Sequence, residues 1–150
     1  MLSLQQISDR LELQQLVTDY AHAIDQRAFE RLDRIFTADA YIDYRAMGGI
    51  DGRYPAIRDW LPLALQSFRG YMHLIGNCSF DVQGDQASGR IACFNPMDIP
   101  LPDGDSQVMF LGLWYIDRYV RTVDGWRISE RREEKSYAFN IPEALKKMLG

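Results

Sequence analysis

Residues 106–137 read SQVMFLGLWYIDRYVRTVDGWRISERREEKSY, and this stretch decides the fold. It consists of two strand-like runs separated by Asp124-Gly125, and the first of them is rich in aromatic and β-branched residues. Asp-Gly between two such runs is among the strongest short signals for a β-hairpin. The first run is longer than an ordinary strand, so we expect a bend or a bulge near Gly112. The stretch predicts two long antiparallel strands, over 106–123 and 126–137.

Two more strands are predicted immediately before this hairpin. Residues 71–82 and 86–99 alternate between two faces, as strands do, and Gln83-Gly84-Asp85 between them is typical of a hairpin connection. Residues 100–104 are predicted to form a loop. The second half of the chain should therefore be a meander of long strands.

The first half has helical spacing instead. Ser3 is a suitable N-cap for a first helix of roughly seven turns. A short helix over 29–36 and a short strand over 40–44 follow, and Pro55 suits the first turn of a third helix, which Pro62 is expected to kink. The apolar stripe of the first helix consists of Leu13, Leu16, Val17, Tyr20, Ala21 and Ile24.

Helices first and strands afterwards indicate an α+β fold rather than alternating β-α-β units. A short helix over 142–149 closes the chain, and no repeat divides it, so we expect a single domain over 1–150. A strongly curved antiparallel sheet has a concave face that its own strands cannot fill. The N-terminal helices can cover that face only in part, which predicts a largely apolar pocket.

The composition argues against several classes of function. The net charge is −4 and the isoelectric point is near 5.1, whereas proteins that bind nucleic acid usually carry a basic face. The basic cluster of Arg127, Arg131 and Arg132 is interleaved with glutamates and is expected to be a solvated strand surface. Cys78 and Cys93 lie in apolar strand-like segments without metal-ligand spacing, so neither a disulfide scaffold nor a metal site is expected.

The expected location is cytoplasmic. The first residues, MLSLQQ, have neither the basic segment nor the apolar core of a signal peptide. No apolar run approaches the roughly 18 residues needed to span a membrane. No membrane partner is therefore expected.

His73 is the sharpest candidate for chemistry. It falls on the mixed, polar face of the strand predicted over 71–82, near the start of that strand. An imidazole, with an unperturbed pKa of about 6.5, can take and release protons at neutral pH. A structural or surface histidine would fit the same pattern, so both interpretations stay open at this point.

Two residues of the first helix are further candidates. Asp25 ends the helix near the negative pole of its dipole, which is favourable only if a cation or imidazolium lies nearby, although pairing with Arg27 would also account for it. Tyr20 lies on the apolar stripe, so its buried hydroxyl needs a partner and could be a pocket donor. His22 falls off the stripe and is expected to be solvated.

The remaining pocket candidates are Tyr44, Trp60, Phe94, Asn95, Trp114 and Lys135. Asn95 is the best of them, because an amide among apolar neighbours requires a hydrogen-bond partner. Packing in the core or at the rim is the alternative for the aromatic residues, and a solvated end is the alternative for Lys135. The sequence has neither a nucleophile elbow for a Ser-His-Asp triad nor a phosphate-binding loop.

Taken together, these residues resemble the SnoaL-like branch of the nuclear transport factor 2-like superfamily, over nearly the whole chain. The functional relatives that the resemblance suggests are scytalone dehydratase, hexachlorocyclohexane dehydrochlorinase and the bile-acid dehydratases. The stretches that carry it are YAHAID at 20–25, LDRIF at 32–36, DA at 39–40, MHLIGN at 72–77, GDQA at 84–87 and YVRTVDGW at 119–126. The stretch YIDYR at 41–45 is similar to scytalone dehydratase in particular.

The resemblance implies a cone-shaped barrel with a buried pocket, in a homodimer or homotrimer. It also implies that Asp25 and His73 form the acid–base dyad of the family's eliminating enzymes, with Tyr20 and Tyr44 as pocket tyrosines. Asp25 would fix the tautomer of His73, and the other ring nitrogen would remove a proton next to an electron-withdrawing group. Such chemistry needs no metal or organic cofactor.

Two departures separate the chain from scytalone dehydratase. That enzyme uses a second histidine, where this chain offers only His22, and it has a tyrosine directly before its aspartate, where Ile24 stands here. The dyad carries over, but the naphthol substrate does not.

The predicted function is a cofactor-independent lyase of the dehydratase type, or an isomerase, acting on a small hydrophobic cyclic molecule. A domain that binds a small molecule without converting it is one alternative. A non-catalytic partner like the β subunits of ring-hydroxylating dioxygenases, which share this fold, is another.

Overall fold

A computed structural model describes residues 1–149 and contains one long helix, several short helices and a seven-stranded sheet. The elements in chain order are α1 (Leu4–Asp25), the 3-10 helix η1 (Phe29–Arg34), β1 (Phe36–Asp43), the 3-10 helix η2 (Arg45–Met47), β2 (Asp51–Arg53), α2 (Tyr54–Leu65), β3 (Gly70–Tyr71), β4 (Leu74–Gln83), β5 (Gln86–Pro100), β6 (Ser106–Thr122), β7 (Gly125–Phe139), the 3-10 helix η3 (Glu143–Leu145) and α3 (Lys146–Leu149).

The sheet has the order β2-β1-β7-β6-β5-β3, and β4 also pairs with β5. The predicted meander is confirmed, because β4, β5, β6 and β7 pair antiparallel in succession. The expectation of a purely antiparallel sheet is wrong, however, because β1 pairs with β7 in parallel. A parallel neighbour needs a long connection, and here all the chain between β1 and β7 supplies it.

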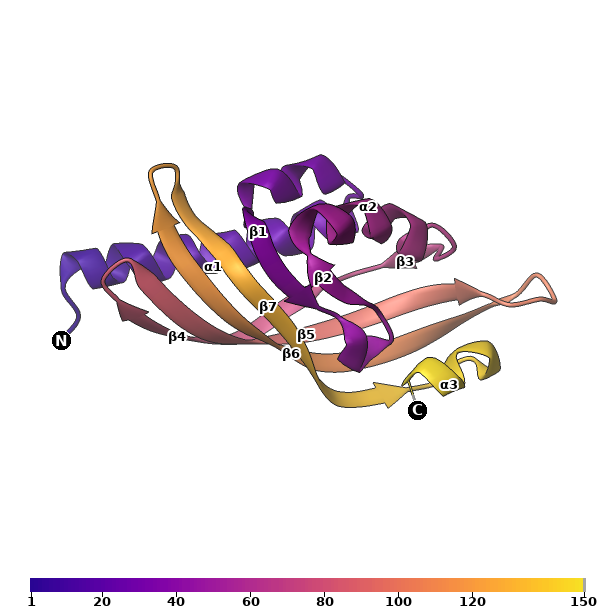
Figure 1. The fold of residues 1–150 in the computed structure, drawn as a ribbon. Coiled ribbons are helices and arrows are strands. Elements are labelled where there is room, and N and C mark those ends of the chain that lie inside the picture. Colours follow the sequence, from indigo (N-terminus) through magenta and orange to yellow (C-terminus); the bar gives the residue numbers. More distant parts are fainter. Residues whose placement is uncertain (150) are drawn as a thin grey trace.

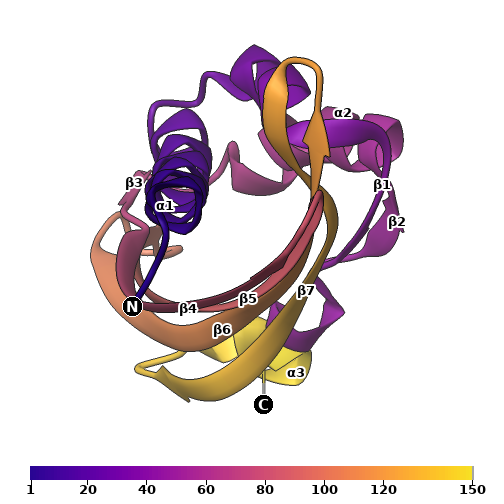
Figure 2. The same cartoon turned by 90° about the vertical axis from the view of Figure 1, so that its left-hand side faces the viewer.

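The sheet curls strongly, and α1 lies along its concave side (Figures 1 and 2). Alternation along β5 is regular: Ile91, Cys93, Asn95 and Met97 are buried on the concave side. The core forms where these side chains meet the apolar stripe of α1 and the inner residues of β6 and β7. The predicted α+β cone is confirmed.

Several predicted boundaries change. The short helix predicted over 29–36 is a 3-10 helix that ends at Arg34, and Phe36 already pairs with Ile128 of β7, so β1 starts earlier than expected. The strand predicted over 71–82 is interrupted, because the residues at 72–73 leave the ladder between β3 and β4. The irregularity expected near Gly112 is confirmed as a register shift against β7.

The N-terminus of α1 is capped as predicted. The Oγ atom of Ser3 accepts a hydrogen bond from the backbone N–H of Gln6, and Oε1 of Gln6 accepts one from the N–H of Ser3. This reciprocal capping box satisfies two donors at the helix start. No helix in the described part of the chain is long and apolar enough to cross a membrane.

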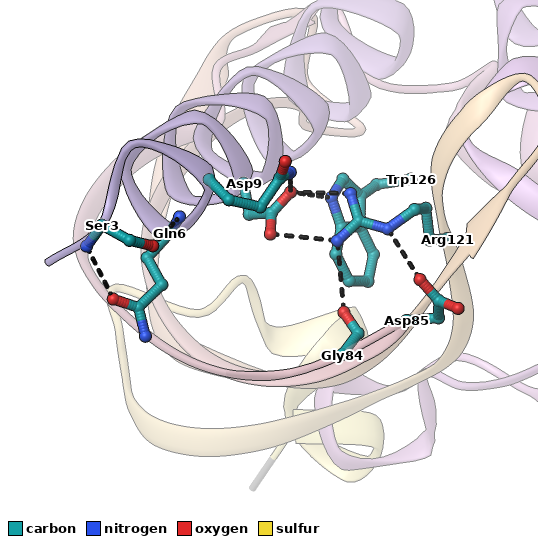
Figure 3. A network of polar contacts seen from close by, with 8 residues as sticks. Ser3, Gln6, Asp9, Gly84, Asp85, Arg121 and Trp126 are labelled. Atoms are coloured by element: carbon teal, nitrogen blue, oxygen red, sulfur yellow. Dashed lines mark hydrogen bonds and ion pairs between the residues drawn. The ribbon is translucent and has the colours of Figure 1, made fainter.

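A charged cluster ties the first turns of α1 to two hairpins of the sheet (Figure 3). Asp9 is only 2% exposed. Its carboxylate accepts hydrogen bonds from Arg121 Nη1 at 2.7 Å and Nη2 at 3.0 Å, and from the indole of Trp126 at 3.2 Å. Arg121 also donates to Asp85 at 2.9 Å and to the carbonyl of Gly84. The cluster therefore fixes α1 against the β4–β5 and β6–β7 turns.

We expect Asp9→Ala to lower the free energy of unfolding by about 2–4 kcal/mol at neutral pH, because it leaves the guanidinium and indole N–H short of an acceptor. The hydrogen bonds from Arg121 above all lower the pKa of Asp9 from 3.8 to about 2. Since the folded-state pKa lies below the unfolded value, this stabilisation is complete above about pH 4 and is lost as the pH falls toward 2.

Urea unfolding at pH 7 and at pH 3 tests this prediction. The wild type should lose more stability between the two pH values than Asp9→Ala does. Asp19→Ala is the matched control, because Asp19 is exposed on the same helix and, among residues 1–149, bonds only Gln15. Equal losses in the two variants at pH 7 would contradict the role given to Asp9.

Candidate active site

A cavity of about 160 Å³ lies between the concave face of the sheet, α1, α2 and the C-terminal segment. Its wall is mainly apolar: Ile24, Met47, Trp60, Leu61, Ala64, Leu65, Phe68, Met97, Met109, Leu111, Leu113, Leu145, Met148 and Leu149 contribute. The polar side chains on the wall are Tyr20, Tyr44, His73, Asn95, Tyr115 and Glu133. A small number of polar groups in an apolar hollow is the usual composition of a small-molecule site.

The structure brings Asp25 and His73 together at this wall. The Nδ1 atom of His73 lies 2.7 Å from Oδ1 of Asp25. The backbone N–H of His73 also donates to the carboxylate, at 2.9 Å to Oδ2 and 3.1 Å to Oδ1. This N–H is free because His73 falls in the break between β3 and β4, where the sheet ladder is interrupted. The two side chains are 8% and 20% exposed, His73 being the less exposed.

This geometry fixes which ring nitrogen of His73 is free. An ionised carboxylate only accepts hydrogen bonds, so Nδ1 carries the proton that is shared with Asp25. Nε2 then keeps its lone pair and is the nitrogen left to meet a ligand in the cavity. The position of Asp25 near the negative end of the helix dipole is unfavourable by itself, and two hydrogen-bond donors of His73, Nδ1 and the backbone N–H, compensate for it.

The ring of Tyr71 packs against the imidazole of His73. The two rings meet edge to face, with centroids 5.9 Å apart. The hydroxyl of Tyr71 donates to the carbonyl of Ile24 at 2.8 Å, and Arg27 lies over the Tyr71 ring at 4.8 Å. Tyr71 was not among the predicted site residues, although its place two residues before His73, on the same face of a strand, was a signal for it. Arg27 therefore supports the site through Tyr71 and does not pair with Asp25.

Tyr20 and Tyr44 form a hydrogen-bonded pair, with their hydroxyl oxygens 2.6 Å apart. Burial raises the pKa of Tyr20 to about 12, and it raises the pKa of Tyr44 well above its usual value. Both phenols therefore stay neutral at physiological pH. Whichever hydroxyl donates, the pair retains one O–H that can be offered to a ligand.

Arg131 lies directly behind these tyrosines and is 0% exposed, so the predicted solvated surface is wrong for this residue. Its guanidinium donates to Asp117 from Nε at 2.8 Å and from Nη2 at 2.6 Å. It is sandwiched between the rings of Tyr20 and Tyr115, at 4.3 and 3.9 Å from their centroids. The Arg131–Asp117 ion pair thus supports Tyr20 and Tyr115, and both of these tyrosines line the cavity.

Glu133 is a cavity residue that the sequence analysis missed. It pairs in register with Tyr115 across β6 and β7, so both side chains point to the concave side. Burial raises the pKa of its carboxyl group well above the usual value, Arg131 opposes that effect, and Asp43 adds to it. Arg131 and Glu133 are two residues apart on one strand, so their side chains lie on the same face. This spacing could have identified Glu133 as a cavity residue once Arg131 was known to point inward.

The other pocket predictions divide. Trp60 and Asn95 line the cavity, and the Oδ1 atom of Asn95 is buried without a hydrogen-bond partner among the described residues. The predictions for Phe94 and Trp114 are wrong, because both side chains occupy outward positions on the convex face: Phe94 stacks on Phe110 and Trp114 lies under Arg90. The prediction that Lys135 reaches the pocket is also wrong.

The amino group of Lys135 donates to the carbonyl of Leu149 instead of reaching the cavity. His22 is exposed, as predicted. Both Cys78 and Cys93 are free thiols. Within residues 1–149, no cluster of three or more His, Cys, Asp or Glu side chains has an arrangement that could hold a metal ion.

A curled sheet that encloses an apolar cavity beneath one long helix defines the class: an α+β cone of the nuclear transport factor 2-like type. Within that class the chain belongs to the family of SnoaL-like domains, whose profile matches residues 5–132. The predicted family is confirmed.

The uncharacterized protein Rv2910c of Mycobacterium tuberculosis is 60% identical over 138 residues, which cover 91% of this chain and 92% of that protein. A proposed scytalone dehydratase from Novosphingobium aromaticivorans is 18% identical, with a TM-score of 0.78 over 91% of this chain and 89% of that one. The hexachlorocyclohexane dehydrochlorinase LinA-type3 from Novosphingobium barchaimii is 20% identical, with a TM-score of 0.78 over 93% and 94% of the two chains. The fold is thus shared with dehydratases and dehydrochlorinases.

Proposed function

We propose that this chain is a cofactor-independent lyase of the dehydratase type, or an isomerase, that acts on a small hydrophobic cyclic molecule through Asp25 and His73. The observation that carries the proposal is the 2.7 Å contact between the His73 Nδ1 and Asp25 Oδ1 atoms at the wall of an apolar cavity. Binding an apolar ligand requires no such pair, and taking a carboxylate out of water costs free energy.

In the proposed reaction, Nε2 of His73 takes a proton from a carbon next to a carbonyl or similar group. Asp25 stabilises the imidazolium that results, because its carboxylate is held against Nδ1. The O–H that Tyr20 and Tyr44 retain would donate to the developing oxyanion. Asn95 would accept a hydrogen bond from a substrate hydroxyl. Acid–base help of this kind gives about 10²–10⁴-fold in rate.

The size of the cavity supports a single ring. Its volume is about 160 Å³, and an apolar protein cavity of about 150 Å³ accommodates one benzene molecule. The methionines and leucines of the wall would exclude water and complement a hydrocarbon ring. A monocyclic substrate with one activating oxygen matches both the volume and the few polar groups.

The solved relatives also support an elimination. A dehydratase removes water and a dehydrochlorinase removes hydrogen chloride, and each reaction includes the loss of a proton from carbon. An isomerase shares that step but returns the proton to another carbon. A binding domain is the alternative that the apolar wall would equally serve.

Turnover of 3-hydroxycyclohexanone tests the proposal. This monocyclic ketone has an acidified C–H beside its carbonyl and a hydroxyl at the next carbon, so elimination gives cyclohex-2-enone, whose absorbance can be followed. We expect the protein to form the enone well above the uncatalysed rate. Tight retention of the unchanged ketone, with no enone formed at any pH, would favour the binding domain instead.

The homodimer or homotrimer stays a prediction. Apolar side chains that would be covered in such an assembly are exposed on the convex face: Leu74, Phe94, Val108, Tyr137 and Phe139. Patches of this kind often mark protein–protein contacts.

A further inference from the structure

We propose that Glu133 is a neutral carboxylic acid that protonates the leaving group, and so is a third catalytic residue beside Asp25 and His73. The inference rests on the proposed elimination and assigns its acid step. The carboxyl group lines the same cavity as His73, and no hydrogen bond to it is found among residues 1–149. It is therefore available to a ligand.

The charges around Glu133 do not favour a carboxylate there. Arg131 is the cation that faces it, but its Nε and Nη2 atoms donate to Asp117, and its buried Nη1 atom has no hydrogen-bond partner among the described residues, Glu133 included. The Asp43 carboxylate is held by Arg45 and repels a second negative charge. Lys135, two residues along β7, directs its amino group to the carbonyl of Leu149.

The remaining neighbours of Glu133 are neutral groups on other elements. They are Tyr20 of α1, Tyr44 after β1, Cys93 of β5 and Tyr115 of β6. Burial raises the pKa of the Cys93 thiol to about 12, so it carries no charge either. The half-buried carboxyl group of Glu133 faces these neutral groups, and its removal from water raises its pKa and favours the protonated form.

Glu133 is also the carboxylic acid on the cavity wall, whereas the other hydroxyl groups there are phenols. Tyr20, with a pKa of about 12, is a poor source of protons at pH 7, and burial also raises the pKa of Tyr44 well above its usual value. A carboxylic acid with a raised pKa is matched to proton donation near neutral pH. The tyrosines are therefore left to bind the carbonyl oxygen, while Glu133 serves the leaving oxygen.

The proton balance of the step is complete. Nε2 of His73 takes the proton from carbon, and the C–H electron pair becomes the new C=C bond as the C–O bond breaks. The Glu133 proton passes to the departing oxygen, which leaves as water. His73 is then an imidazolium and Glu133 a carboxylate. After product release, solvent water returns the proton from His73 to Glu133.

Leaving-group dependence tests the role of Glu133. We expect Glu133→Gln to lower turnover of 3-hydroxycyclohexanone by about 10²–10⁴-fold. Its effect on 3-chlorocyclohexanone, after subtraction of the uncatalysed rate, should be far smaller, because chloride leaves without a proton. Glu134→Gln is the matched control and should change neither rate, since Glu134 is exposed and paired with Arg90.

His73→Ala separates this inference from the proposed function. It should slow both substrates alike, because both lose the same carbon-bound proton. If Glu133→Gln also slows the reactions of both substrates alike, or slows neither, Glu133 is not the acid.

If the wild type turns over neither ketone, the proposed function fails, and infrared spectroscopy still decides the protonation state of Glu133. The carbonyl stretch of a protonated carboxyl group should be present at pH 7 in the wild type and absent from Glu133→Gln; its absence from the wild type would overturn the inference.

Discussion

Turnover of 3-hydroxycyclohexanone should fall by about 10²–10⁴-fold when His73 is replaced by Ala, with the fold intact. The loss follows from the removal of Nε2, the base that the Asp25 contact leaves free. The backbone N–H of residue 73 still reaches Asp25 in the variant, so the break between β3 and β4 should persist. Enone formation and far-ultraviolet circular dichroism measure the two effects.

His22→Ala is the matched control for that experiment. His22 is exposed on α1, so its loss should leave enone formation unchanged. Added imidazole should restore part of the activity of His73→Ala, since the vacated space opens on the cavity. Full activity in His73→Ala would remove the basis of the proposed function.

Asp25→Asn should cause a loss of similar size for a different reason. An amide can donate a hydrogen bond to Nδ1, which would place the proton on Nε2 and leave no base toward the cavity. A neutral amide also fails to stabilise the imidazolium. Asp19→Asn, on the exposed side of the same helix, is the control that should retain activity.

The largest loss of stability is expected from Asp117→Ala, at about 3–5 kcal/mol, because it leaves the Arg131 guanidinium buried without a counter-charge. Both side chains of this ion pair are 0% exposed. Asp117 also accepts a hydrogen bond from the hydroxyl of Tyr119 at 2.6 Å, which is lost as well. A change of this size is a substantial part of the roughly 5–15 kcal/mol that holds an ordinary domain folded.

A double variant distinguishes the buried charge from simple loss of packing. Adding Arg131→Met to Asp117→Ala removes the unpaired cation, so the double variant should be more stable than the sum of the two single losses predicts. Arg118→Ala is the control, because Arg118 follows Asp117 on β6 but is 76% exposed at its side chain. It should change stability by no more than about 0.5 kcal/mol in urea unfolding. Strictly additive losses would contradict the ion-pair argument.

The sequence by itself determined the local elements. The Ser3–Gln6 capping box, the Asp124-Gly125 hairpin and the alternation along β5 each depend on residues close together in the chain. Local patterns of this kind are readable because helix and strand periods differ. The same alternation could have excluded Phe94 from the pocket, since neighbouring residues of a strand point to opposite faces and Asn95 points inward.

Only the tertiary structure decided which charged residues face the cavity. Trp126 and Ile128 of β7 are buried, and without an irregularity the next inward residues would be Glu130 and Arg132. A register shift between Arg118 and Tyr119 leaves Ser129 as an extra residue on β7. Arg131 and Glu133 therefore turn inward, because a one-residue slip exchanges the two faces of a strand.

The meeting of Asp25 with His73 has the same kind of cause. The break after β3 frees the His73 N–H, and the sheet must curl before the end of α1 can reach it. Breaks, bulges and curvature depend on hydrogen bonds between strands that are distant in the chain. A pattern of single residues carries little information about such bonds, so resemblance could suggest the pair but only the folded chain supplies its geometry.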